Sequence, residues 1–191
     1  MIRDYRNAAA DGRYRSFAEN PQKIPFSFVY DGVKYTGFSP EFFELKDKKV
    51  ENAKDKETIN FVFGFADVLN VTVVLTHYFS HGATEWTVWF ENVSDRDSKV
   101  IEKAETSLDF IGKQPVLKGI LGDHVNQYRP YSHDITGGSF DFSSDTGRAT
   151  HINFPYFNLE YGDGGVMLAI GWAGTWHANF SSTGDVTTYT A

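Results

Sequence analysis

The residues most able to do chemistry gather in the second half of the chain, where polar and aromatic side chains stand between glycines. They fall in four runs: KGILGDH at residues 118–124, QYRPY at 127–131, GRATHIN at 147–153 and GWAGTW at 171–176. A sugar offers flat C–H patches to aromatic rings, and its hydroxyl groups bind carboxylate, guanidinium, amide and imidazole groups. Because these runs supply both kinds of side chain, they suit a carbohydrate ligand.

The same side chains also have ordinary structural roles. Aromatic rings are bulky fillers of β-sandwich cores, and arginine or histidine in a loop is commonly only solvated. Trp172 and Trp176 stand four residues apart, so a continuous strand would place them on one face. Gly171 and Gly174 interrupt that run and could break its register.

Several other chemistries lack the residues that they need. The chain has no cysteine, which excludes disulfides, thiol nucleophiles, iron–sulfur clusters and cysteine-bound zinc. His77 and His81 have helical zinc spacing, but no glutamate follows His77 and the local pattern is that of a strand, so we expect no metal. The glycine pairs at 137–138 and 164–165 are not followed by a helix, so neither is a phosphate-binding loop. We therefore expect no cofactor.

Charge and hydropathy narrow the choice of partners. The chain carries 18 Lys and Arg against 25 Asp and Glu, a net charge of −7, whereas a nucleic-acid binder needs a basic stripe. No stretch approaches the roughly 18 apolar residues of a membrane helix, and the polar start is unlike a signal peptide. We expect neither nucleic acid nor membrane as a partner, and a cytoplasmic location.

The elements that must position these residues are strands. Apolar residues alternate on both sides of Asp31-Gly32, which predicts a β-hairpin. A second hairpin is expected at the glycine-rich turn of residues 162–165. Six further runs have the strand pattern, at residues 58–65, 70–79, 85–91, 99–108, 154–161 and 166–172, and two more follow at 176–180 and 186–190. So many short strands predict an all-β, antiparallel β-sandwich.

Two segments fall outside this pattern. Residues 1–20 are expected to be a lead-in segment, with one sandwich domain over residues 21–191. Residues 47–57 hold eight charged residues in eleven, so they are expected to form a solvated loop or a short helical turn. We find no amphipathic helix, and the abrupt end in a strand pattern predicts a domain truncated at its C-terminus.

Four motifs together resemble a known family. The runs FPYFNL at 154–159 and VMLAIGWAGTW at 166–176 resemble an aromatic strand, a glycine turn and the GWxGQW motif of glycoside hydrolase family 36, the α-galactosidases or melibiases. Gly147-Arg148 is similar to the GRSS loop of that family. The segments at 86–102 and 118–130 resemble two further motifs, and all four stand in the family's order.

The resemblance implies a fold and a role. It implies a galactose-mutarotase-like β-supersandwich, the non-catalytic amino-terminal domain of a retaining α-galactosidase, which in the parent protein precedes a catalytic (β/α)₈ barrel. The barrel's nucleophile lies in a Lys-x-Asp motif, and this chain has no such motif, so we expect no catalytic residue here. The implied partners are a galactoside and the barrel, with a homo-oligomer left open.

The resemblance also selects candidate sugar contacts. They are Trp172, Trp176, Arg148 and Asp123, which we expect to face the substrate pocket. Two departures bear on these contacts. Thr175 stands where the family has glutamine, and the run ATH at 149–151 replaces serines.

Two other functions remain open at this point. A free-standing carbohydrate-binding module would bind sugar by itself through Trp172 or Trp176. An aldose-epimerase-like enzyme would share the supersandwich and needs a histidine pair with a glutamate base. His124, His133 and His151 are available for such a pair, but no matching motif surrounds them.

Overall fold

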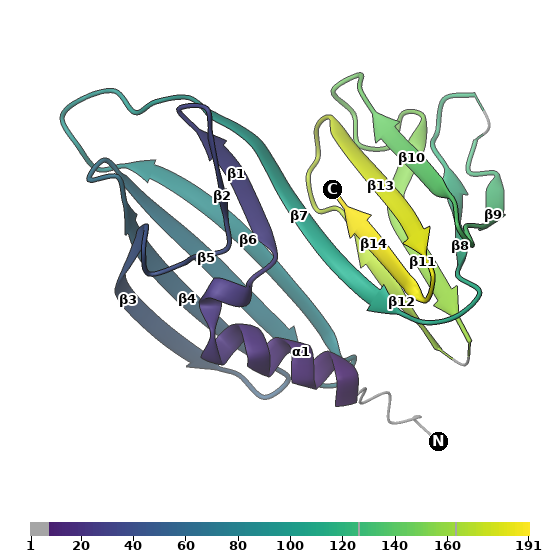
Figure 1. The fold of residues 1–191 in the computed structure, drawn as a ribbon, viewed down its shortest axis with the longest axis horizontal. Coiled ribbons are helices and arrows are strands. Elements are labelled where there is room, and N and C mark those ends of the chain that lie inside the picture. The colour runs from purple at the N-terminus through teal and green to yellow at the C-terminus, as the bar shows by residue number, and fades with distance from the viewer. Residues whose placement is uncertain (1–7, 126, 163) are drawn as a thin grey trace. The chain divides into compact units, whose positions relative to one another are not determined.

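The computed structural model describes residues 8–125, 127–162 and 164–191. The chain divides into two compact units, Met1–Ala104 and Glu105–Ala191. Strands dominate both units, all observed pairings are antiparallel, and strand β7 (Ile101–Ile111) runs from the first unit into the second (Figure 1). The predicted all-β, antiparallel sandwich class is confirmed. The assignment of residues 21–191 to one domain stays a prediction.

The first unit is built on a four-stranded sheet in chain order. Its strands are β3 (Phe43–Asn52), β4 (Lys56–Phe65), β5 (Leu69–Tyr78) and β6 (Ala83–Asn92). Along each strand, every second side chain points to the inner face of the sheet. The buried apolar residues of that face on β4 and β5 are Ile59, Phe61, Phe63, Phe65, Leu69, Val71, Val73 and Leu75.

A hairpin covers this inner face. It consists of β1 (Phe26–Tyr30) and β2 (Val33–Thr36), and it follows the short 3₁₀ helix η1 (Pro21–Lys23). The Phe28 ring is 5.0 to 6.2 Å from the rings of Phe43, Phe65 and Phe90. Asp31 and Gly32 turn the hairpin with φ of 50° and 79°, as the Asp-Gly pattern predicts.

A helix precedes the hairpin, where we expected only a lead-in segment and no helix. Helix α1 (Ala8–Glu19) packs Tyr14 against His77, with ring centroids 4.5 Å apart, and Phe17 against Trp86 at 6.0 Å. Tyr14 and Phe17 are buried and lie three residues apart, on one face of the helix. These tertiary contacts stabilise a segment whose own apolar pattern is weak.

The expectation for residues 47–57 is wrong. Most of this charged segment forms strands β3 and β4, joined by a short turn at residues 53–55. β3 is an edge strand, so its side chains can stay exposed while its backbone pairs with β4 from Asn52↔Glu57 to Phe43↔Phe65. Charged residues and a register shift between Leu45 and Asp47 are usual protections of such an edge.

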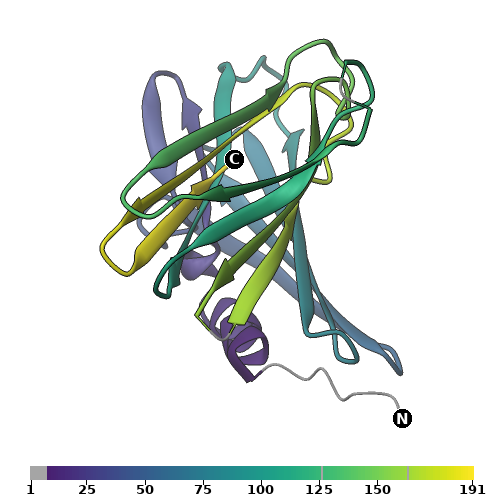
Figure 2. The same ribbon diagram turned by 90° about the vertical axis from the view of Figure 1, so that its right-hand side faces the viewer.

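The second unit is a sandwich of two sheets. One sheet has the order β10 (Ser139–Ser144), β13 (Trp176–Thr183), β14 (Val186–Thr190), β7, and the other β12 (Gly164–Ala169), β11 (Asn153–Tyr161), β8 (Val116–Leu121), β9 (Pro130–Asp134). The sheets form separate layers, with yellow β13 and β14 in one and yellow-green β11 and β12 in the other (Figure 2). Both contribute to one core, made of Phe110, Leu117, Ile135, Phe142, Phe157, Leu159, Trp176, Ala178, Phe180 and Tyr189.

Within the described residues, no helix is long and apolar enough to cross a membrane.

Candidate functional site

Two loops of the second unit bring most of the candidate residues together. One loop follows β8 at residues 122–124, and the other leads into β11 at residues 147–152. Their backbones are joined by hydrogen bonds from the N–H of Gly122 to Ile152, of Asp123 to Thr150 and of His124 to His151, at 2.8, 2.8 and 3.1 Å.

Gly122 is required for this close approach. A Cβ atom at this position would lie 2.2 Å from the carbonyl oxygen of Thr150, well inside van der Waals contact. The absence of a side chain therefore lets the two loops join.

Asp123 and Arg148 meet across this junction. The Nη2 atom of Arg148 lies 3.4 Å from Oδ1 of Asp123, and Thr150 donates its hydroxyl proton to Oδ2 of Asp123 over 3.1 Å. The Oδ1 atom is buried and has no hydrogen-bond donor among the described residues. The ion pair with Arg148 is thus the main compensation for the burial of Oδ1. We call Asp123, His124, Arg148, Thr150 and His151 the loop cluster.

Arg148 also determines the tautomer of the neutral His151 ring. Its Nη2 lies 2.6 Å from Nδ1 of His151. A guanidinium group can only donate, so Nδ1 is the acceptor and the proton of the neutral ring sits on Nε2. His124 stacks on His151 with ring centroids 4.3 Å apart. The loop cluster therefore offers hydrogen-bond donors from Arg148 and His151, with Arg148 held by the carboxylate of Asp123.

The two tryptophans occupy opposite environments. Trp176 is 6% exposed, and its Nε1 donates to the carbonyl of Ala149 over 2.7 Å. Trp172 is 67% exposed and lies between the strands, because β12 ends at Ala169 and β13 begins at Trp176. The two rings therefore do not share a face of one strand. Trp176 lies in the core, and its hydrogen bond to Ala149 holds the loop that carries Arg148.

The histidines are only partly brought together. His124 and His151 stack, whereas His133 packs between Tyr131 and Phe140, with ring centroids 5.1 and 4.8 Å away. Across the described parts of the chain, no group of three or more His, Asp or Glu side chains is placed to hold a metal ion. Ala149 and Thr150 also make contacts in this loop. Nothing in the sequence around these two residues indicated those contacts.

No family model matches the chain, and no curated protein matches it. Comparison of structures is informative instead. The GH36 α-galactosidase AgaA of Geobacillus stearothermophilus matches 87% of this chain with 14% identity and a TM-score of 0.59. The galactosidase domain of the α-galactosidase–sucrose kinase AgaSK matches all of it, with 15% identity and a TM-score of 0.65.

The chain has the fold of a domain of GH36 α-galactosidases. An α-galactosidase from Lactobacillus brevis also matches, over 87% of this chain, with 15% identity and a TM-score of 0.57. The match covers 26% of AgaA, 31% of the AgaSK domain and 25% of the Lactobacillus protein. The chain thus spans less than a third of these solved chains. The fold implied by the sequence motifs is confirmed.

Proposed function

We propose that this chain is the non-catalytic amino-terminal domain of a retaining α-galactosidase-like glycoside hydrolase. In this role it packs on a catalytic barrel and helps to shape the pocket for a galactoside. The observation that carries the proposal is the structural likeness over 87–100% of the chain to enzymes that are three to four times longer. The order of the four sequence motifs, from residue 86 to residue 176, supports it independently.

The loop cluster supports the sugar-contacting part of the proposal. A galactoside is neutral and rich in hydroxyl groups, each of which donates and accepts. Arg148 and His151 supply donors, Asp123 holds the guanidinium of Arg148 in place, and the exposed ring of Trp172 supplies a stacking surface. We assign Trp176 to this site as a positioning residue, because its ring is buried and acts through the loop at Ala149.

The first test is hydrolysis of 4-nitrophenyl α-galactoside. We expect no turnover by the 191-residue chain and turnover by the complete product of its gene, with retention of anomeric configuration in proton NMR spectra. Turnover by the 191-residue chain alone would overturn the proposal, as would a complete gene product without a catalytic domain.

A second test addresses the pocket residues in the complete gene product. Trp172→Ala should raise KM for the galactoside by about tenfold, because the variant loses the stacking of the ring on the sugar. A tenfold change corresponds to about 1.4 kcal/mol of binding free energy. The matched control is Trp89→Ala, which removes an equally exposed tryptophan (63% against 67%) from the outer face of β6. An equal effect of the two variants would contradict the assignment of Trp172.

A further inference from the structure

A row of outward side chains lies along β11, on the face of its sheet opposite to the core. Phe154, Tyr156, Asn158 and Glu160 alternate there with buried Pro155, Phe157 and Leu159. Four alternate positions at about 3.3 Å per residue extend over about 20 Å. The row is aromatic at its first half and polar at its second.

The aromatic half is built by an irregularity in the sheet. β11 pairs with β8 at Asn153↔Leu121 and again at Phe157↔Gly119, so four steps along β11 match two steps along β8. Such a bulge changes the direction in which the neighbouring side chains point. It leaves the rings of Phe154 and Tyr156 stacked, with centroids 5.3 Å apart, and Tyr128 meets Phe154 edge-on at 6.1 Å. Tyr156 and Tyr128 are 50% and 53% exposed, so the rings present an open apolar surface.

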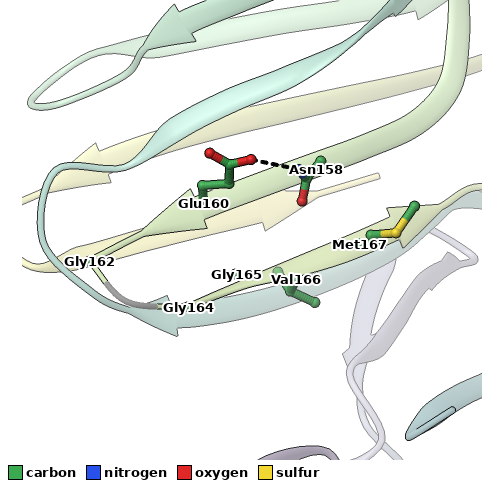
Figure 3. A pocket seen from close by; sticks show the side chains of 7 residues that line it. All are labelled: Asn158, Glu160, Gly162, Gly164, Gly165, Val166 and Met167. Carbon is green, nitrogen blue, oxygen red and sulfur yellow. Dashed lines mark hydrogen bonds between the residues drawn. The ribbon is translucent and has the colours of Figure 1, made fainter. Parts of the chain in front are cut away.

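The polar half is a hydrogen-bonded group beside a shallow pocket. Lys118 on β8 donates to Oε2 of Glu160 over 2.6 Å, and the side-chain amide of Asn158 donates to Oε1 over 2.9 Å. Figure 3 shows Asn158 and Glu160 on the same stretch of β11, with the bare backbone of Gly164 and Gly165 beside them. A Cβ atom on Gly165 would lie 2.8 Å from the carbonyl oxygen of Leu159, so the backbone here has no room for a side chain at position 165.

We propose that this surface binds a neutral oligosaccharide along β11. Sugar rings stack on Tyr156 and Phe154, and their hydroxyl groups bond the free donors of Lys118 and the carbonyl oxygen of Asn158. The charge of the surface favours a neutral ligand over an anionic one, because Lys118 is already paired with Glu160. This site is distinct from the loop cluster in its residues, and it does not depend on a catalytic domain elsewhere in the protein.

The test is a titration of the ¹⁵N-labelled 191-residue chain with stachyose, maltotetraose and cellotetraose at millimolar concentrations. We expect at least one of these sugars to shift the amide signals of Lys118, Tyr156 and Asn158. Tyr156→Ala should weaken that binding about tenfold or more, as loss of a central aromatic contact does. Tyr156→Phe keeps the ring and should bind within about twofold of the parent chain. Trp89→Ala is the matched control, since its ring is exposed on a different sheet, and it should leave binding unchanged.

Three results would overturn the proposal. The first is the absence of shifts along β11 with all three sugars. The second is that shifts are confined to the loop cluster and Trp172, which would place the sugar site there and leave the proposed function intact. The third is concentration-dependent dimerisation that Tyr156→Ala abolishes while sugar binding stays unchanged, which would make this surface an interface between copies of the chain.

Discussion

The guanidinium of Arg148 donates a hydrogen bond to Nδ1 of His151 over 2.6 Å. Because arginine does not give up its proton, this contact selects the His151 tautomer that carries its proton on Nε2. The imidazole N–H then becomes a donor of fixed direction within the loop cluster.

The tautomer can be observed directly. In long-range ¹H–¹⁵N correlation spectra at neutral pH, Nδ1 of His151 should appear unprotonated and Nε2 protonated. Arg148→Ala should produce a mixture of the two tautomers, because the selecting donor is gone. Arg129→Ala, which removes an exposed arginine on the loop before β9, should leave the His151 spectrum unchanged. Observation of a protonated Nδ1 in the parent chain would refute this assignment.

Trp176 and Trp172 should differ sharply in their contribution to stability. Trp176→Phe removes the donor to Ala149 and leaves space in the core of the second unit, so we expect it to lower the free energy of unfolding by about 2 kcal/mol. Trp172→Phe changes an exposed ring and should stay within about 0.5 kcal/mol. Urea unfolding followed by circular dichroism measures both. Equal losses in the two variants would contradict the structural role of Trp176.

Strands with clear alternation were predictable from the sequence. The run EWTVWFE predicts Trp86, Val88 and Phe90 on one face and Trp89 on the other, and the structure shows the first three half-buried and Trp89 63% exposed. Strands β4, β5, β11, β13 and β14 lie within a few residues of the predicted runs. Period-two patterning works here because each sheet has one buried face.

Elements held by distant contacts were not predictable in the same way. β3 has almost no buried side chain, and its pairing with β4 is made by the backbone, which leaves no hydropathy signal. The loop cluster shows the same limit. Arg148 and Asp123 were selected from local motifs, but their contact arises from the joining of two loops 25 residues apart in the chain. The even spacing of Trp172 and Trp176 failed as a guide because no strand includes both.

Helix α1 depends on one buried histidine of the sheet. His77 is 2% exposed, its Nε2 lies 3.1 Å from Oδ1 of Asp11, and its Nδ1 lies 2.9 Å from the hydroxyl oxygen of Thr84. Asp11→Ala would leave Nε2 buried without its helix partner, which costs about 1–3 kcal/mol. The helix should loosen first, because it loses its polar contact with the sheet and because Gly12 within it is a poor helix former.

Hydrogen–deuterium exchange tests this role of Asp11. The amides of residues 10–19 should exchange faster in Asp11→Ala, while the amides of β4 and β5 stay protected. The control is Glu51→Ala, which removes an exposed acid that pairs with Lys49 and should leave the exchange of α1 unchanged. Unaltered exchange in Asp11→Ala would show that Tyr14 and Phe17 suffice to hold the helix.

Tyr131 should make the second unit sensitive to alkali. Its hydroxyl oxygen is buried without a hydrogen-bond partner among the described residues, and burial raises the pKa of this phenol to about 12. The folded chain therefore holds this proton more tightly than the unfolded chain, whose phenol titrates near pH 10. The resulting contribution to stability is fully present below pH 10 and is lost as the pH rises toward 12.

Tyr131→Phe tests both parts of this argument. At neutral pH the variant should be more stable by about 1 kcal/mol, because an unsatisfied buried hydroxyl is removed while the ring still packs on Phe142. Above pH 10 its free energy of unfolding should fall less steeply than that of the parent chain. Tyr156→Phe, which removes an exposed hydroxyl, should match the parent chain at neutral pH. A loss of stability at neutral pH in Tyr131→Phe would mean that the hydroxyl has a partner, and the pH dependence would then need another source.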